Sequence, residues 1–178
     1  MKTSIKLFAI ALVLLGFGVS GNAQSNSATA TATGTLVSAL TISGGGTLSF
    51  GRIVAGTGGT VVVPGIAAPT RTSALGLAGG TVTSAGFTIS GADGSQFVVT
   101  LPSAAVRVNH TDNTNFMEVT AFSCDVAAAG TAVAGTTANS TLTGTTRTFY
   151  VGATLNVKTG DPTGTYTSAT FPVTVSYQ

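Results

Sequence analysis

The side chains that could do chemistry are few and lie mostly in one polar stretch. His110 is the only histidine, and the Asp112 carboxylate two positions later could join it in a metal site. Asp112, Asn113 and Asn115 also offer the oxygen ligands that calcium prefers. However, no second His or Cys stands at ligand spacing, and turns favour Asn and Asp for backbone reasons alone. We therefore expect a polar turn between two strands here, with no metal and no cofactor.

Cys124 is the only cysteine, so the chain cannot form an internal disulfide. A lone thiol at the end of a strand is most often buried, and that is our expectation for it. No Ser stands in a Gly-x-Ser-x-Gly sequence, and a Ser-His-Asp group would have to be assembled around His110. We expect no catalytic residues and no enzyme. The contrary hypothesis requires His110 or Cys124 to line a concave pocket.

The N-terminus has the pattern of a secretory signal peptide. Lys2 and Lys6 precede an apolar run from Leu7 to Leu15, and the small residues Gly21 and Ala23 stand at the usual cleavage positions. We place cleavage after Ala23, which leaves residues 24–178 as the mature chain. No later stretch approaches the roughly 20 apolar residues of a membrane span. The sequence predicts a protein secreted through the periplasm to the cell surface or the medium.

Charge excludes one class of function and helps to decide the fold class. The chain has seven basic and five acidic side chains, and removing Lys2 and Lys6 leaves five against five. A neutral chain with isolated charges has no basic patch for phosphates, so we expect no nucleic-acid partner. Only 7% of residues are charged, against roughly a quarter in ordinary globular chains. The abundant Thr and Gly disfavour helices and suit strands joined by tight turns.

Period-two alternation predicts a single all-β domain, an antiparallel β-sandwich. The longest alternation, of Ala and Thr and then heavier residues, covers 28–43 and ends at a Gly triplet. The other strands that we expect are 47–54, 60–63, 81–83, 87–90, 97–101, 105–108, 117–124, 146–157 and 166–177. Residues 91–96, with Asp93-Gly94 at the tip, suggest a hairpin loop. The stretch from Val126 to Thr145, low in complexity, suggests a long loop with one short strand near 140–143.

The two ends of the mature chain look complementary. The last expected strand runs to the C-terminus, and Pro172 within it fits an edge or a bulge better than a sheet centre. A terminal strand with a free edge needs a partner, because its unpaired N-H and C=O groups template association. The Ala-Thr alternation at residues 28–35 is the natural partner, from the same chain or from a neighbouring one.

These segments resemble a known family. The carrying sequences are Ala28-Thr29-Ala30-Thr31-Ala32, Leu48-Ser49-Phe50-Gly51, Phe149-Tyr150-Val151-Gly152-Ala153-Thr154-Leu155, Gly164-Thr165-Tyr166 and Val173-Thr174-Val175-Ser176-Tyr177. Together they are similar to the secreted bacterial domains of unknown function family 4402, over nearly the whole mature chain. The closing strand with its Gly and penultimate Tyr is also similar to the end of chaperone-usher pilins and spore-coat U domains.

The pilin resemblance implies an incomplete immunoglobulin-like β-sandwich, residues 36–178, preceded by an N-terminal extension, residues 24–35. In pilins the end motif pairs with a periplasmic chaperone, and the extension of one subunit completes the next. By the same resemblance, the terminal strand and assembly edge would be Gly164, Phe171, Val173, Val175 and Tyr177, and the donor face would be Ala28, Ala30, Ala32 and Leu36. This chain lacks the cysteine pair of many pilins and has Ala where bulky donor residues usually stand.

Two functions follow as hypotheses. The first is a secreted structural subunit of a surface filament, pilus-like fibre or coat, which self-associates by β-strand addition. The alternative is a monomeric extracellular binding or adhesion module whose N-terminal strand pairs within its own chain.

Overall fold

The computed structural model describes residues 26–168 and 170–178, and these residues form strands and no helix. The chain divides after Thr35, and all the strands belong to the part that begins at Leu36. The strand pairings are antiparallel throughout, so the all-β and antiparallel predictions are confirmed. The predicted signal peptide and the first residues of the extension lie outside the described residues.

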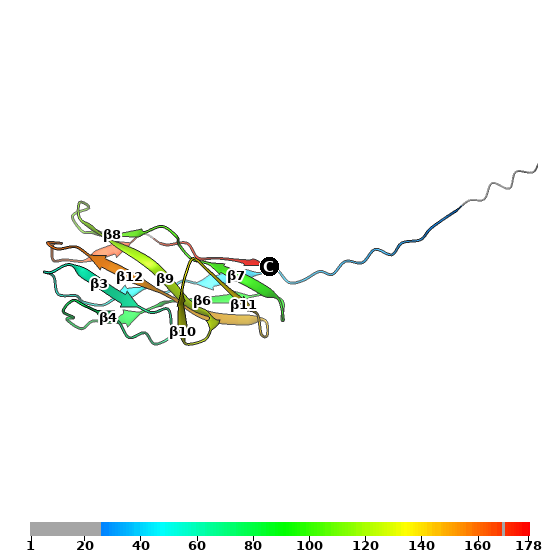
Figure 1. Cartoon of the computed structure of the whole chain (residues 1–178), viewed down its shortest axis with the longest axis horizontal. Helices are drawn as coiled ribbons and strands as arrows, with labels where there is room; N and C mark the ends of the chain where they lie inside the picture. The colour runs from blue at the N-terminus through cyan, green and yellow to red at the C-terminus, as the bar shows by residue number, and fades with distance from the viewer. Residues whose placement is uncertain (1–25, 169) are drawn as a thin grey trace, which may run out of the picture. The chain divides into compact units, whose positions relative to one another are not determined.

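Nine strands make one curled sheet (Figure 1). Its main order is β1-β6-β12-β9-β8-β13, while β10 pairs with β9, and β3 joins β12 to β4. The bounds are β1 Thr41–Gly44, β3 Gly59–Val63, β4 Thr72–Ser73, β6 Ala85–Ser90, β8 Val106–His110, β9 Phe116–Ala128, β10 Thr131–Ala134, β12 Thr146–Val157 and β13 Tyr166–Ser168. The long strands β9 and β12 run side by side and carry the other strands of the sheet.

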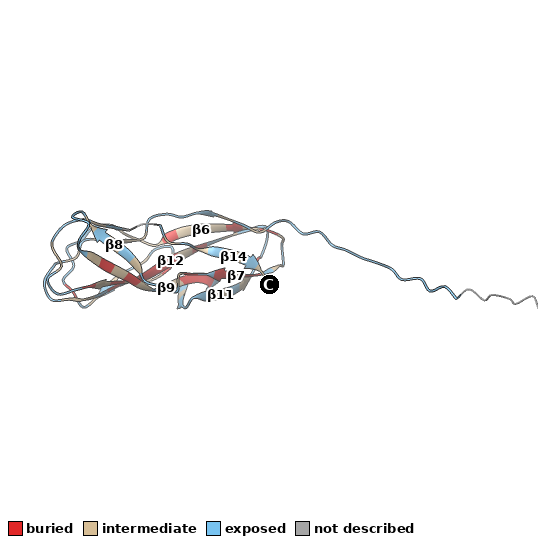
Figure 2. Ribbon diagram, turned by 90° about the horizontal axis from the view of Figure 1, so that it is seen from above, coloured by how far each residue is buried: buried red, intermediate tan, exposed pale blue. Residues whose placement is uncertain are grey.

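Two smaller sheets complete the fold. One has the order β11-β7-β14, with β11 at Thr137–Thr141, β7 at Gln96–Thr100 and β14 at Thr174–Tyr177. The other pairs β2, Ser49–Phe50, with β5, Val82–Thr83. Alternate side chains of β7 point into the core and are fully buried, whereas those of β14 stay half-buried (Figure 2). The three-stranded sheet therefore covers the core mainly through β7.

The core is one apolar cluster between the sheets. Its largest fully buried side chains are Phe97, Phe149, Ile89 and Leu142, which come from β7, β12, β6 and the segment after β11. Each such side chain contributes roughly 1.5–3 kcal/mol by leaving water. The sequence alternation in β12 produces this result directly, because the residues from Phe149 to Val157 at every second position face inward.

Strand β12 changes partner at Gly152. Its first half pairs with β6 up to Val151, and its second half pairs with β3 from Ala153 onward. On the opposite edge the register with β9 shifts at the same place, and Ala121 of β9 adopts a φ of 46°. An extra residue in one strand bends it and increases its twist. This bulge therefore lets both long strands turn from one half of the sheet into the other.

The partner change requires two glycines. A Cβ at Gly152 would collide with the backbone of Val63 and Pro64, and a Cβ at Gly65 would collide with the carbonyl oxygen of Ser123. The Gly65 N-H also donates to the Ser123 hydroxyl at 3.2 Å. Here two backbones touch directly, and only a residue without a side chain fits.

Two predicted strands need correction. The alternation at 28–43 predicted one long strand, but only Thr41–Gly44 is paired, and residues 26–40 lie in no strand. The partner of Thr41 is Ser90, the last residue of β6, so no strand remains for the residues before it. The predicted strand 166–177 is two strands in different sheets, since β13 pairs with β8 and β14 with β7. Pro172 lies between them, where the missing N-H costs no ladder hydrogen bond.

Two loop predictions were also wrong. Residues 91–96 do not close a hairpin, because β6 and β7 belong to different sheets and the segment connects them. The low-complexity stretch 126–145 is not mainly a loop: it contains the end of β9, all of β10 and all of β11. Main-chain pairing with β9 and β7 forms these strands without bulky side chains. The predicted strand 47–54 shortens to β2, since Gly51 turns the chain at a φ of 71°.

Replacing Gly152 by Ala tests the close approach. We expect G152A to lower the free energy of unfolding by about 3 kcal/mol, because the new methyl group can be placed only by moving backbone. Gly46→Ala is the matched control, since a Cβ there would stand 3.6 Å from its nearest neighbour atom. Urea unfolding of both variants measures the difference. Equal stability of the two variants would contradict this account of β12.

Candidate functional site

An open groove lies along one side of the core. It has a volume of about 1140 Å³. One wall is the segment 45–56 with β2, and the other runs from Thr163 through β13 to Phe171. The floor consists of inward-facing residues of the large sheet, namely Phe87, Val106, Val108, Met117, Val119, Leu155 and Val157. Met117, Val119, Leu155 and Val157 are themselves buried core residues, so the groove runs directly over the core.

The groove exists because the layer opposite the large sheet is thin at this point. Only the two-residue strands β2 and β5 and the coil before β14 lie over this part of the described core. The apolar side chains of the walls pack against the core cluster yet stay half-buried. Phe171, for example, meets the buried Phe122 ring at 5.2 Å between centroids. The fold thus leaves an open groove between two segments of the chain.

The first wall is held by Arg71. Its guanidinium donates to the carbonyl oxygens of Phe50 and Gly79, and the second of these bonds is 2.9 Å long. A Cβ at Gly51 would collide with this guanidinium. The arginine therefore fixes the turn at which β2 ends. Sequence reasoning missed this role, although a lone Arg in a charge-poor, Gly-rich region could have signalled it.

The second wall is held by His110. Its Nε2 lies 3.3 Å from the Thr163 carbonyl oxygen, and its ring lies 4.9 Å from the Tyr166 ring between centroids. A Cβ at Gly164 would collide with the imidazole, so the glycine lets the wall close over His110. Gly164 itself precedes β13 and lies in no strand, unlike its predicted place in the terminal strand. His110 positions this wall.

Asp112 organises the turn that carries His110. Its carboxylate accepts hydrogen bonds from the backbone N-H groups of Thr114 and Asn115, at 2.8 and 3.0 Å, and from the Asn115 amide at 2.7 Å. It also lies 2.9 Å from Nδ1 of His110. The Asn115 and Thr114 hydrogen bonds hold the pKa of Asp112 well below its ordinary value. Within the described residues, no three His, Cys, Asp or Glu side chains gather as metal ligands would.

The predicted site residues separate into two groups. Phe171, Val173, Val175 and Tyr177 lie along the coil before β14 and on β14 itself, all half-buried, and the first three pack against the core. Ala28, Ala30, Ala32 and Leu36 are exposed and lie in no strand. Leu36 is 98% exposed, which is unusual for a large apolar side chain.

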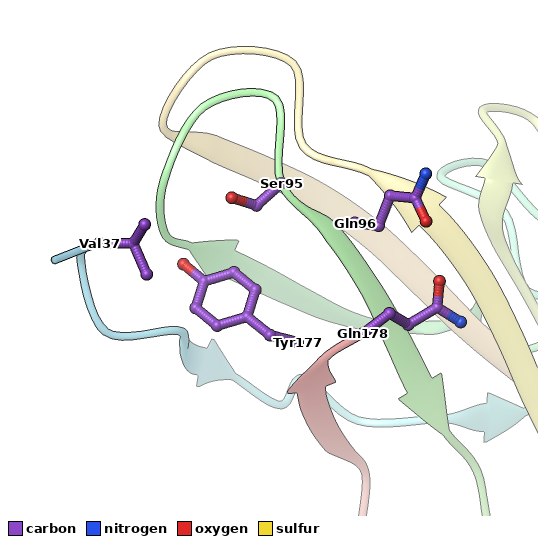
Figure 3. A pocket seen from close by; sticks show the side chains of 5 residues that line it. All are labelled: Val37, Ser95, Gln96, Tyr177 and Gln178. Atoms are coloured by element: carbon purple, nitrogen blue, oxygen red, sulfur yellow. The ribbon is translucent and has the colours of Figure 1, made fainter. Parts of the chain in front are cut away.

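Cys124 is fully buried, as the sequence analysis expected, and burial raises the pKa of its thiol. Neither Cys124 nor His110 lines the groove or the smaller cavity at the C-terminus. That smaller cavity, of about 350 Å³, is lined by Val37, Ser95, Gln96, Tyr177 and Gln178 (Figure 3). No helix among residues 26–168 and 170–178 is long and apolar enough to cross a membrane.

The chain matches one family of known proteins over most of its length. Residues 40–177 match the family described as Domain of unknown function (DUF4402). The chain belongs to the DUF4402 family. The matched region begins just before β1 and ends with β14, so a DUF4402 domain contains both walls of the groove and leaves residues 26–39 outside. Among curated proteins, none matches this chain.

The lowered pKa of Asp112 predicts a pH-dependent contribution to stability. A carboxyl whose folded pKa is depressed stabilises the fold above its unfolded pKa of about 3.9, and that stabilisation is lost as the pH falls toward the folded pKa. We expect Asp112→Ala to unfold at lower urea concentration than the native chain at pH 7. The difference between the two midpoints should shrink steadily below pH 4. A difference that stays constant down to pH 2 would contradict the role given to this carboxylate.

Proposed function

We propose that this protein is a secreted structural subunit that assembles into a surface filament or coat by β-strand addition. In this proposal the domain is an immunoglobulin-like β-sandwich that lacks one strand, and an extension from a neighbouring copy supplies it. The observation that carries the proposal is the groove of about 1140 Å³ between two extended segments, with core side chains as its floor. The proposal assigns no enzymatic chemistry to the chain.

A strand is the occupant that suits this groove best. In strand addition the main chain of the guest pairs with exposed edges, and its alternate side chains enter pockets below. Here β2 pairs only with β5 and β13 only with β8 among the described strands, so each groove wall contains a strand with an unpaired edge. The floor between them is apolar, and Arg52, Lys158 and Asp161 are the charged residues that line the groove. An uncharged, extended segment would meet the least electrostatic cost there.

The N-terminal extension has the required properties. Residues 26–35 are exposed, lie in no strand and contain no charged side chain. As a strand these ten residues would span about 33 Å, at ~3.3 Å per residue. The second wall, from Thr163 to Phe171, has nine residues and would span about 30 Å by the same measure. The lengths match, and the Ala-Thr alternation would turn Ala28, Ala30 and Ala32 toward the floor.

The small donor side chains affect the binding energy. An Ala methyl group removes little apolar surface from water, at ~25 cal/mol per Å², so main-chain pairing would supply most of the affinity. The neutral charge balance of the mature chain reduces repulsion between copies. The similarity of the C-terminal strand to chaperone-usher pilins adds one partner to the proposal, a periplasmic chaperone that would cover the groove before assembly.

Deleting residues 24–35 tests the proposal directly. We expect the mature chain, residues 24–178, to form oligomers whose size rises with concentration, and the shortened chain to be monomeric. Size-exclusion chromatography with light scattering measures both. Circular dichroism should show the same strand content for the two proteins, because residues 26–35 lie in no strand. Oligomers that survive the deletion would sink the proposal.

Substitutions at two adjacent positions test which side chains of the donor strand face the groove. We expect Ala30→Asp to raise the concentration needed for assembly at least tenfold, because it would place a carboxylate over the apolar floor. Thr31→Asp is the matched control, since its side chain would face solvent and leave assembly nearly unchanged. Both residues are exposed in the described chain, so neither change should affect folding. Equal effects of the two substitutions would argue against insertion as a strand.

A further inference from the structure

Leu36 is the most exposed large apolar side chain among the described residues. It is 98% exposed, and Val37 beside it is 61% exposed. A single exposed leucine is common on protein surfaces, but this one stands where the extension joins the domain. Residues 26–35 are only Asn, Ser, Ala, Thr and Gly. Leu36 is therefore the residue at this end of the extension that could bury the most apolar surface in a neighbouring molecule.

The chain is attached to the domain directly after Leu36. The Tyr177 hydroxyl donates to the Ser38 carbonyl oxygen at 2.8 Å, and Val37 lines the small cavity beside Tyr177 (Figure 3). Leu36 precedes this attachment and lies in no strand. It is thus the last residue whose side chain can enter a neighbouring copy while Ser38 stays in place. Two extended residues span only ~7 Å, so the neighbour's groove would have to begin close to this attachment.

The groove has one apolar end and one charged end. At the apolar end, Phe87 stands opposite Phe149 in the first half of β12. At the other end, Lys158 directly follows β12, and its backbone N-H donates to the Asp161 carboxylate at 2.8 Å. A leucine side chain loses least by leaving water at the apolar end, because no charged group there has to be desolvated.

The walls give a guest strand a direction. The second wall begins at Thr163, two residues after Asp161, and finishes at Phe171, which packs on Phe122 of β9. The first wall begins at Gly45, beside Phe87, and so runs the opposite way. A guest with its residue 36 at the apolar end would therefore run parallel to the second wall. Residues 28–36 would then lie along the wall 163–171, nine residues against nine.

We infer that Leu36 is the anchor of the added strand: it enters a second copy of this chain between Phe87 and Phe171 and sets the direction of the extension in the groove. This role rests on the proposed strand addition and makes it more specific. Leu36 falls on the same face of an extended strand as the alanines at 28, 30 and 32, because alternate residues share a face. The attachment at Ser38 leaves no free linker, so successive copies would touch.

Leu36→Ala in the mature chain tests the anchor, with Leu77→Ala as the matched control. Leu77 is 42% exposed and is not among the residues that line the groove. We expect L36A to raise the concentration needed for assembly about thirtyfold, because three apolar carbon atoms would no longer be buried. L77A should leave that concentration unchanged, and Leu36→Met, which keeps the apolar surface, should assemble as the native chain does. Urea unfolding of L36A monomers should match that of native monomers, since Leu36 is exposed in the domain.

Pairs of cysteines test the direction of the guest strand. Thr35→Cys with Thr47→Cys, treated with a short bismaleimide, should give linked dimers on a denaturing gel, because Thr47 lines the apolar end. Thr35→Cys with Thr163→Cys should give few dimers, because Thr163 lines the charged end. Cys124 is fully buried and does not compete for the reagent. The reverse pattern of links would overturn the direction assigned to the strand.

The failure of this role can be told apart from the failure of the proposed function. Native chains that stay monomeric at every concentration would overturn strand addition itself, and the role of Leu36 with it. Native chains and L36A chains that assemble at the same concentration would overturn only the role of Leu36. Equal weakening of assembly by L36A and L77A would do the same.

Discussion

The direct contact of two backbones at Gly65 and Gly152 is the constraint on which the rest of the domain depends. No side chain separates the chain after β3 from the middle of β12, so β12 can lose β6 as a neighbour and gain β3 within two residues. The bulge at Ala121 bends β9 at the same level. As a result the inward face of β12 stays continuous from Phe149 to Val157, and one core serves both halves of the large sheet.

The layer opposite the large sheet does not cover the core continuously, and the groove is the consequence. β7 covers the first half of the core with fully buried side chains. Over the second half, the chain supplies only the short strands β2 and β5 and two walls, one held by Arg71 and the other by His110. Because each wall is anchored from outside the groove, the gap between them persists without a strand to fill it.

The outer face of the three-stranded sheet carries hydroxyl side chains and no charge at its centre. On the three-stranded sheet, Thr137 and Thr174 flank Thr100 in register, and all three are exposed. Hydroxyl side chains keep such a face solvated without giving it charge. With seven basic and five acidic side chains, the chain carries little net charge and so little long-range repulsion against its own kind. Soluble monomers usually carry more charge than this.

The sequence predicted the parts of the fold that depend on local alternation. Strand β12 was predicted with its observed bounds, and β3, β6, β7 and β8 were predicted to within two residues at either end. Short-range patterns suffice there, because period-two alternation and flanking Gly or Pro determine which face of a strand is buried. The prediction was wrong where a strand forms through main-chain pairing alone, as in β10 and β11. It was also wrong where an alternating segment lacks a neighbour, as at residues 28–40.

The candidate site, like the fold, could be predicted from the sequence only in part. The sequence by itself determined that residues 26–35 and 170–178 carry no charge, and that Phe171, Val175 and Tyr177 share one face. Only the tertiary structure decided that the last strand is split between two sheets, that His110 and Arg71 hold the walls of a groove, and that the Tyr177 hydroxyl binds Ser38. The physical reason is the distance along the chain between the residues that interact. Alternation acts between neighbours in the chain, whereas the groove depends on contacts such as that between His110 and Thr163, 53 positions apart, which no local pattern encodes.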